Sequence, residues 1–330
     1  MSAPAGDYFP SPVGGAPFPH DLVPSILFAV LYGLLAPLVI YRMTSKRTRN
    51  VMLIAAAVFA LERIADFSIR AAEATIPRDR TSTGIVTYMQ TTYSMGFVSI
   101  GQCLLVLLRC LLVNSASPST GATYKTIVEE HDYESRNPLT ARMDNASTDE
   151  RFSSASTLTI TEVVPEVEKR RQSYRRACIA ASMVYYAVIA LGSIAGSLYF
   201  KAISSPSTAK LVQHMRYAST AISLCLLFGT AGVSMYILYT KPSHSRPALF
   251  IITNSLLITI PAIYRLIVMR FQTDSIVSTA PGSLNSPGSK ATFYIFHIVP
   301  ELVVTAHLFS VDVRELFQVG PLGQPQPRSK

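Results

Sequence analysis

The stretch Ala60-Leu-Glu-Arg-Ile-Ala-Asp-Phe-Ser-Ile-Arg70 places four charges inside an apolar run that begins at Val51. On a helix of 3.6 residues per turn these charges fall within an arc of about 100°. They are Glu62, Arg63, Asp66 and Arg70. An ionisable group at membrane depth costs several kcal/mol if it faces lipid, so such groups normally face a bundle interior and pair there. The stretch therefore predicts a membrane helix whose polar stripe faces other helices.

The composition is that of an integral membrane protein, because 49% of the 330 residues are hydrophobic and only 15% are charged. The net charge of +9 does not indicate a nucleic-acid partner. The basic residues cluster at the ends of apolar runs, which is the pattern of membrane orientation. We expect the lipid bilayer to surround the protein, in the plasma membrane or an endomembrane, and we expect no nucleic acid.

Seven apolar runs are long enough to cross a bilayer, for which about 20 residues suffice. They lie at 23–41, 51–71, 81–108, 178–200, 217–240, 248–270 and 291–313. A single hydrophobic segment satisfies its own backbone only as a helix. The sequence therefore predicts an all-α polytopic membrane protein with seven transmembrane helices. Helices 1–3 fall within residues 22–113 and helices 4–7 within residues 174–313.

The orientation follows from lysine and arginine, which accumulate on the cytosolic side of membrane proteins. With the N-terminus outside, the inner links hold 19 of these residues and the outer links hold eight. We therefore expect residues 1–21 to be a flexible extracytosolic tail and residues 314–330 to be a cytosolic tail.

Residues 114–173 differ in kind from the spans. They hold 17 serines or threonines and ten of the chain's 20 acidic residues. Such a composition buries too little apolar surface to offset ordering entropy, so it predicts a disordered cytosolic loop. We expect a cytosolic signalling partner to bind there. Arg170-Arg171-Gln172-Ser173 also fits a basophilic kinase site at Ser173, although positive-inside charge explains the same arginines.

Charged groups of three spans are expected at a common depth. With a rise of about 1.5 Å per residue, they lie from the bilayer midplane to about 10 Å above it. They are Glu62, Arg63, Asp66, Arg265, His297 and Glu301. These residues indicate either a polar cavity that opens outward and takes a ligand or buried ion pairs that only fix helix packing. We expect Arg265 to pair with Asp66 or Glu301, and Arg63 to pair within its own helix.

Three further motifs each have a structural and a functional interpretation. The His297 and Glu301 pair has no converging third ligand, so neither a metal nor a cofactor is expected. The third span is unusually polar, which suits a pocket and interhelical hydrogen bonds equally. Gly192-Ser-Ile-Ala-Gly196 lets another helix approach closely, and packing within the chain is the simpler interpretation than dimerisation.

The outline resembles a G-protein-coupled receptor, but the motifs depart from that family. No acidic residue precedes Arg109, and Val299-Pro-Glu-Leu-Val303 replaces an Asn-Pro-x-x-Tyr pattern. The seventh span has no lysine for a retinal Schiff base. The stretch from Phe59 to Arg70 and Leu107-Leu-Arg109 resemble uncharacterised fungal seven-span proteins that are receptor-like in outline. Ile263-Tyr-Arg265 is weakly similar to the fungal lipid-translocating exporters linked to toxicant resistance.

Three function classes follow from these observations. A receptor-like sensor suits the topology and the large inner loop. A transporter or translocator of lipids or small amphipathic molecules suits the buried charges, although no inverted repeat relates the early and late spans. An enzyme is not expected, because no nucleophile–base or metal set converges.

Overall fold

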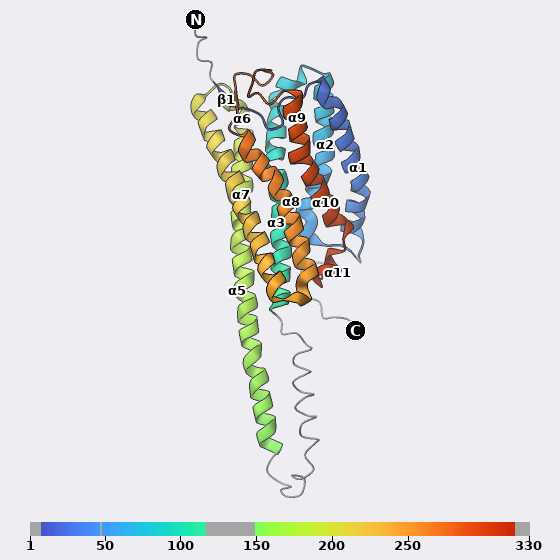
Figure 1. The fold of residues 1–330 in the computed structure, drawn as a ribbon, viewed down its shortest axis with the longest axis vertical. Helices are drawn as coiled ribbons and strands as arrows, with labels where there is room; N and C mark the ends of the chain where they lie inside the picture. The colour runs from blue at the N-terminus through green and yellow to red at the C-terminus, as the bar shows by residue number, and fades with distance from the viewer. Residues whose placement is uncertain (1–7, 47, 117–148, 321–330) are drawn as a thin grey trace.

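The computed structural model describes residues 8–46, 48–116 and 149–320, and for 149–165 only the backbone. The chain forms an elongated bundle of long helices with a small two-stranded sheet at one end (Figure 1). The long helices are α1 (Leu22–Thr44), α2 (Ile54–Thr75), α3 (Thr83–Ser115), α5 (Asp149–Ser197), α7 (Pro206–Thr240) and α8 (Ser245–Val268). The shorter ones are α6 (Tyr199–Ala202), α9 (Pro287–Phe293), η5 (Tyr294–Ile298), α10 (Val299–Ser310) and α11 (Val313–Phe317).

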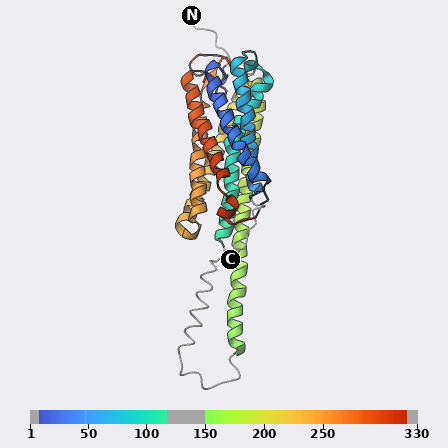
Figure 2. The same cartoon turned by 90° about the vertical axis from the view of Figure 1, so that its right-hand side faces the viewer.

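In the part of the chain that the structure describes, six helical stretches are long and apolar enough to cross a membrane. They are Pro19–Thr44, Thr83–Ser115, Glu166–Ser197, Pro206–Thr240, Pro242–Val268 and Pro287–Ser310. The predicted all-α, polytopic membrane architecture is confirmed at this level. We call the end with the N-terminal segment the outer end, and the end from which α5 projects the inner end (Figure 2).

Helix α3 is the most buried of these stretches and contacts α2, α5, α7 and α8. Its contact with α5 depends on small residues. A Cβ on Gly192 would lie 3.2 Å from the Ser94 Cβ, and one on Gly196 would lie 2.7 Å from the Thr91 Cα. The predicted packing of Gly192 and Gly196 within the chain is therefore confirmed.

Helix α2 turns its charges inward and its apolar residues outward, as the opening stretch predicts. Arg63 and Asp66 are fully buried, whereas Val58 is 61% exposed and Ile54 is 54% exposed. A soluble helix has the opposite pattern, because water solvates charges better than apolar groups. Helix α2 packs against α1 and α3 beside the six apolar stretches.

The flexible tail predicted for 1–21 is wrong for the residues that the structure describes. Strand β1 (Phe9–Pro10) pairs antiparallel with β2 (Gln272–Thr273) in the loop between α8 and α9. Phe9 and Val13 are buried, and the 3₁₀ turn η1 (Pro19–Asp21) leads into α1. The segment can be buried because side chains of the bundle bind its backbone, as described below.

The disordered loop predicted for 114–173 is also wrong at its C-terminal end. Helix α5 begins at Asp149, outside the bundle, and continues without a break into the apolar stretch Glu166–Ser197 (Figure 1). Acid–base pairs at helical spacing support this extension: Arg170 lies 4.0 Å from Glu166, and Arg171 lies 3.7 Å from Glu168. Residues 117–148 lie outside the described residues, so the prediction for them stays a prediction.

Candidate functional site: two buried charge clusters

At the outer end, the carboxylate of Asp21 binds two cations from other helices. Arg70 Nη2 lies 3.1 Å from Asp21 Oδ1, and Lys290 Nζ lies 3.1 Å from Asp21 Oδ2. The Tyr294 hydroxyl also donates to Asp21 over 3.1 Å. All four side chains are buried. We call Asp21, Arg70, Lys290 and Tyr294 the clamp.

The clamp cations also hold the backbone of the N-terminal segment, residues 9–21. Arg70 Nη2 donates to the Gly14 carbonyl over 2.6 Å. Lys290 Nζ donates to the carbonyls of Gly14 and Ala16 over 2.7 and 2.6 Å. Two cations therefore neutralise one carboxylate and at the same time satisfy carbonyl oxygens that would otherwise be buried without donors.

Side chains outside the clamp bind the same segment from α3, α6, α7 and the loop before α9. The pairs are Tyr199 donating to Pro10 O (2.7 Å), Arg216 to Ser11 O (3.3 Å), Val13 N to Gln90 Oε1 (3.1 Å) and Ala16 N to Asn285 Oδ1 (2.7 Å). The N-terminal segment is thus held like an extended peptide, chiefly through its main chain.

Two glycines let this segment approach closely. Gly14 and Gly15 have φ of +77° and +61°, a conformation that other residues rarely adopt. A Cβ on Gly14 would lie 2.9 Å from the Phe293 ring, and one on Gly15 would lie 2.9 Å from Lys290 Nζ. A larger residue at either position would displace the segment from the clamp.

Deeper in the bundle, Arg63 bridges two carboxylates. Arg63 Nη1 lies 2.6 Å from Asp66 on the same helix, and Nη2 lies 2.9 Å from Glu301 on α10. The predicted pairing of Arg63 within its own helix is confirmed, and a second pair crosses from α2 to α10. Gly96 on α3 makes room for it, because a Cβ there would lie 3.0 Å from Glu301 Oε1 and still closer to Arg63.

The prediction that Arg265 pairs with Asp66 or Glu301 is wrong. Arg265 instead donates to the Tyr93 carbonyl, and its Nη2 lies 3.5 Å from the Ser94 hydroxyl. Arg63 already holds both acids, so Arg265 takes neutral acceptors on α3. Sequence depth places these groups in one slab but does not specify which side chains come within hydrogen-bond distance.

His297 lies beside Glu301, with Nε2 3.4 Å from Glu301 Oε1. It belongs to the π-helical turn η5, a distortion found often at functional sites. In the described part of the chain, both ring nitrogens and Glu301 Oε1 have no hydrogen-bond partner, although all are buried. We call Arg63, Asp66, Arg265, His297 and Glu301 the core cluster.

Aromatic rings separate the clamp from the core cluster and touch cations of both. The Phe293 ring lies 5.0 Å from the Arg70 guanidinium and 5.4 Å from the Tyr93 ring. Tyr93 in turn lies 5.1 Å from the Arg63 guanidinium. Cation–π contacts of this length are favourable, so the two charge clusters are joined through Phe293 and Tyr93.

Five of the six predicted site residues lie together in the core cluster, and Glu62 lies half-buried at its edge. The predicted cavity that opens outward is wrong in this structure, because the members of the core cluster are at most 1% exposed. The N-terminal segment covers their outer side and leaves a space of about 20 Å³ beside Arg70 and Tyr93. Ser173 lies exposed on α5, and its phosphorylation stays a prediction.

Sequence reasoning missed the clamp. The sequence places Arg70 on the polar stripe of its helix, but it indicates a tail at Asp21 and a loop at Lys290. A usable signal exists, since Asp21 and Lys290 each stand directly before an apolar run, and both of these runs begin at the same side of the bundle. An acid and a base in such positions lie at the same height, which permits pairing if their helices are neighbours.

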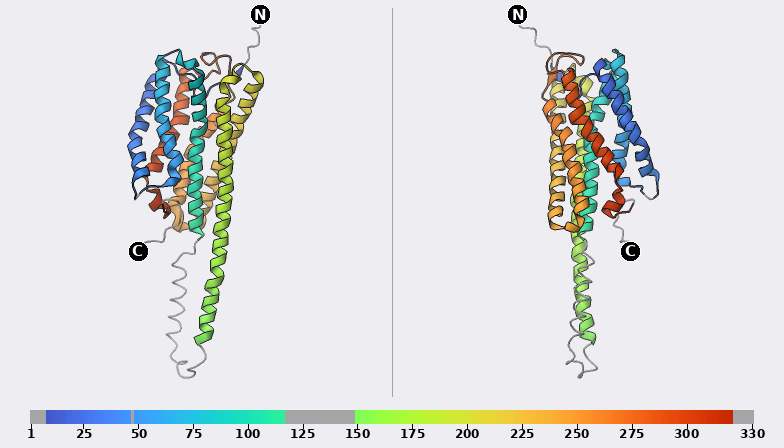
Figure 3. Two further views of the ribbon diagram at one scale, coloured as in Figure 1. Left: turned by 180° about the vertical axis from the view of Figure 1, so that it is seen from behind. Right: turned by 45° about the vertical axis from the view of Figure 1, so that its right-hand side comes forward.

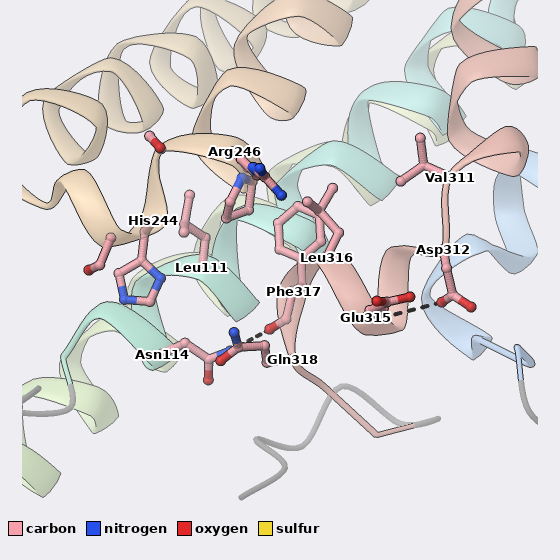
Figure 4. Close-up of a pocket in the computed structure, with 13 residues that line it drawn as sticks. Leu111, Asn114, His244, Arg246, Val311, Asp312, Glu315, Leu316, Phe317 and Gln318 are labelled. Atoms are coloured by element: carbon pink, nitrogen blue, oxygen red, sulfur yellow. Dashed lines mark hydrogen bonds between the residues drawn. The ribbon is translucent and has the colours of Figure 1, made fainter. Parts of the chain in front are cut away.

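At the inner end, a cavity of about 440 Å³ lies between α3, the link from α7 to α8, and α11 (Figure 4). His244, Arg246 and Glu315 line it, and Asn114 donates to the Phe317 carbonyl over 2.6 Å. The first part of the predicted tail is therefore folded against the bundle, with Phe317 buried. Residues 321–330 lie outside the described residues.

Comparisons with protein-family models, curated proteins and solved structures find no match to this chain. In the described residues, no group of three His, Cys, Asp or Glu side chains is arranged to hold a metal ion.

Proposed function

We propose that the protein is a receptor-like membrane sensor in which an outer ligand acts by moving the N-terminal segment. The observation that carries this proposal is the binding of that segment to the clamp. An amphipathic ligand with a carboxylate or phosphate group would compete with Asp21 for Arg70 and Lys290, because both cations prefer a charged acceptor to a backbone carbonyl.

The aromatic contacts support transmission from the clamp to the core cluster. Tyr294 and His297 lie in the same π-helical turn, one in each cluster. A change in that turn would shift both side chains relative to α2, since a π-turn and an α-turn place them at different angles. Such a coupled, two-state element is what a sensor requires.

The test is a distance measurement at the inner end after release of the clamp. Spin labels go on Ala177→Cys and Ser243→Cys in a Cys225→Ser background, because both sites are exposed and the other cysteines are buried. Asp21→Asn should shift the distance distribution in nanodiscs. Asp274→Asn, which changes an exposed acid nearby in the outer loop, should not. An unchanged distribution in Asp21→Asn would contradict the sensor proposal.

We also infer that α2 crosses the membrane in addition to the six apolar stretches, which gives seven spans with the N-terminus outside. The inward charges and outward apolar residues of α2 support this count, and the 19 inner against eight outer basic residues support the orientation. Epitope tags before Tyr8 and within 117–148, probed on intact and permeabilised cells, test it. Detection of the 117–148 tag on intact cells would reverse the orientation.

A translocator of lipids or small amphipathic molecules is the second candidate. A crevice between α2 and α5, described below, favours it because it opens sideways towards lipid. The weak similarity to lipid-translocating exporters points the same way. Movement of a headgroup-labelled lipid across the membrane of proteoliposomes would support this candidate if the wild type moves the lipid and Gly96→Ala moves it more slowly. Absence of movement with a responsive inner end would favour the sensor.

A further inference from the structure

A lateral crevice of about 360 Å³ is lined by residues of α2, α3 and α5. Helix α3 lies between α2 and α5 on this side of the bundle (Figure 3, left). Helix α2 contributes Ile54 and Ala55, α3 contributes Gln102 and Arg109, and α5 contributes Tyr186. Ile54 and Tyr186 are each 54% exposed on the outside of the bundle. In a membrane-spanning bundle this surface faces lipid chains rather than water.

Arg109 is half-buried at the inner end of the crevice. No acidic side chain or hydrogen-bond acceptor of the described residues pairs with it. Gly101 faces Tyr185 in the antiparallel α3–α5 contact. Arg109 is eight residues further along α3, so it lies roughly level with Arg176 on α5. Exposed Arg49 stands two residues before Val51, which also lines the crevice, so Arg49 and Arg176 add positive charge at the inner end where Arg109 lies.

Polar character continues inside the crevice. Gln102 lies about 10 Å deeper than Arg109 along α3 and is also half-buried. An amide at that depth, beside apolar Val106, can donate to an ester carbonyl and leaves room for a hydrocarbon chain. A charged mouth, one polar group beneath it and apolar walls match the order of groups along a phospholipid.

We propose that the crevice binds one anionic glycerophospholipid of the leaflet at the inner end. Its phosphate contacts Arg109, and one acyl chain lies along Ile54 and Val106. The charge of the mouth selects an anionic over a zwitterionic headgroup, because basic residues near the surface attract acidic lipids. This site depends on the membrane-spanning bundle and not on the sensor proposal.

Native mass spectrometry of the full chain from nanodiscs tests the site, with equal amounts of phosphatidylserine and phosphatidylcholine carrying the same chains. The wild type should retain one phosphatidylserine in preference. Arg109→Gln should weaken that retention about fivefold, and Arg109→Lys should keep most of it. Ala55→Leu should reduce retention by filling the crevice. Lys241→Gln, an exposed charge at the inner end of α7, is the matched control and should change nothing.

Three outcomes would overturn the proposal. Equal retention of phosphatidylserine by Arg109→Gln and the wild type would contradict the contact between the phosphate and Arg109. An equal loss in Lys241→Gln would mean diffuse surface attraction. Full retention in Ala55→Leu would place the lipid outside the crevice. Thermal unfolding of each variant, together with the charge-preserving Arg109→Lys, separates a lost site from a lost fold.

Discussion

The clamp and the core cluster use the same chemistry on different partners. In the core cluster Arg63 binds two side-chain carboxylates, one on α2 and one on α10. In the clamp Arg70 and Lys290 share one carboxylate and complete their hydrogen bonds with carbonyls of the N-terminal segment. Carbonyls can be replaced by water or a ligand at the outer end, whereas buried carboxylates cannot be replaced by lipid. The core cluster therefore joins α2 to α10, and the clamp joins α2 and α9 to the N-terminal segment.

The largest expected effect is that of Arg63→Met. It leaves Asp66 and Glu301 buried without their cation, which costs about 3–5 kcal/mol. The triple variant with Asp66→Asn and Glu301→Gln removes the stranded charges and should recover part of the folded yield. Monodisperse protein recovered in size-exclusion chromatography measures this. A triple variant as poor as the single one would show that the charges are not coupled.

Asp21→Asn should loosen the N-terminal segment without unfolding the bundle. It removes the charged acceptor shared by Arg70 and Lys290, a loss of about 1.5–3 kcal/mol for hydrogen bonds to a charged group. Hydrogen exchange at the amides of Val13 and Ala16 should accelerate while the folded yield stays close to wild type. A matching loss of yield would make the clamp structural, like the core cluster.

Gly96→Ala tests the fit around Arg63 without changing any charge. Its Cβ would overlap the Arg63 guanidinium and lie 2.8 Å from the Phe59 ring. Overpacking of this kind typically costs about 1–3 kcal/mol. Gly229→Ala on α7 is the control, because a Cβ there meets nothing within 4 Å. The thermal midpoints of the two variants should differ, and equal midpoints would contradict the close approach of α3 to the core cluster.

Arg265→Met should have the smallest effect of the four. Arg265 donates to a carbonyl and a hydroxyl, so its removal strands no carboxylate and should cost about 0.5–1.5 kcal/mol. Adding Glu301→Gln should give no rescue, in contrast to the Arg63 series. Rescue of the thermal midpoint would mean that Arg265 pairs with Glu301 in the membrane.

The sequence predicts which charged residues of the core cluster lie at the same height along their helices. Glu301, His297 and Arg265 could be placed in one slab with Arg63 and Asp66 because rise per residue converts position into height. The clamp was not predicted, since Asp21 and Lys290 are 269 positions apart in the printed sequence. The composition of 114–173 predicts disorder, whereas the structure extends α5 back to Asp149, with acid–base pairs at helical spacing such as Glu166 and Arg170.

The sequence by itself determined the membrane class, the placement of the long apolar helices and the inward direction of the charges on α2. These depend on local composition and on the cost of placing charge in lipid, which each segment carries alone. Only the tertiary structure decided that Arg63 rather than Arg265 binds Glu301, that Gly96 admits this pair and that residues 9–21 fill the outer end. Those outcomes require side chains from distant segments to meet within about 3 Å, and such contacts are set by how whole helices pack.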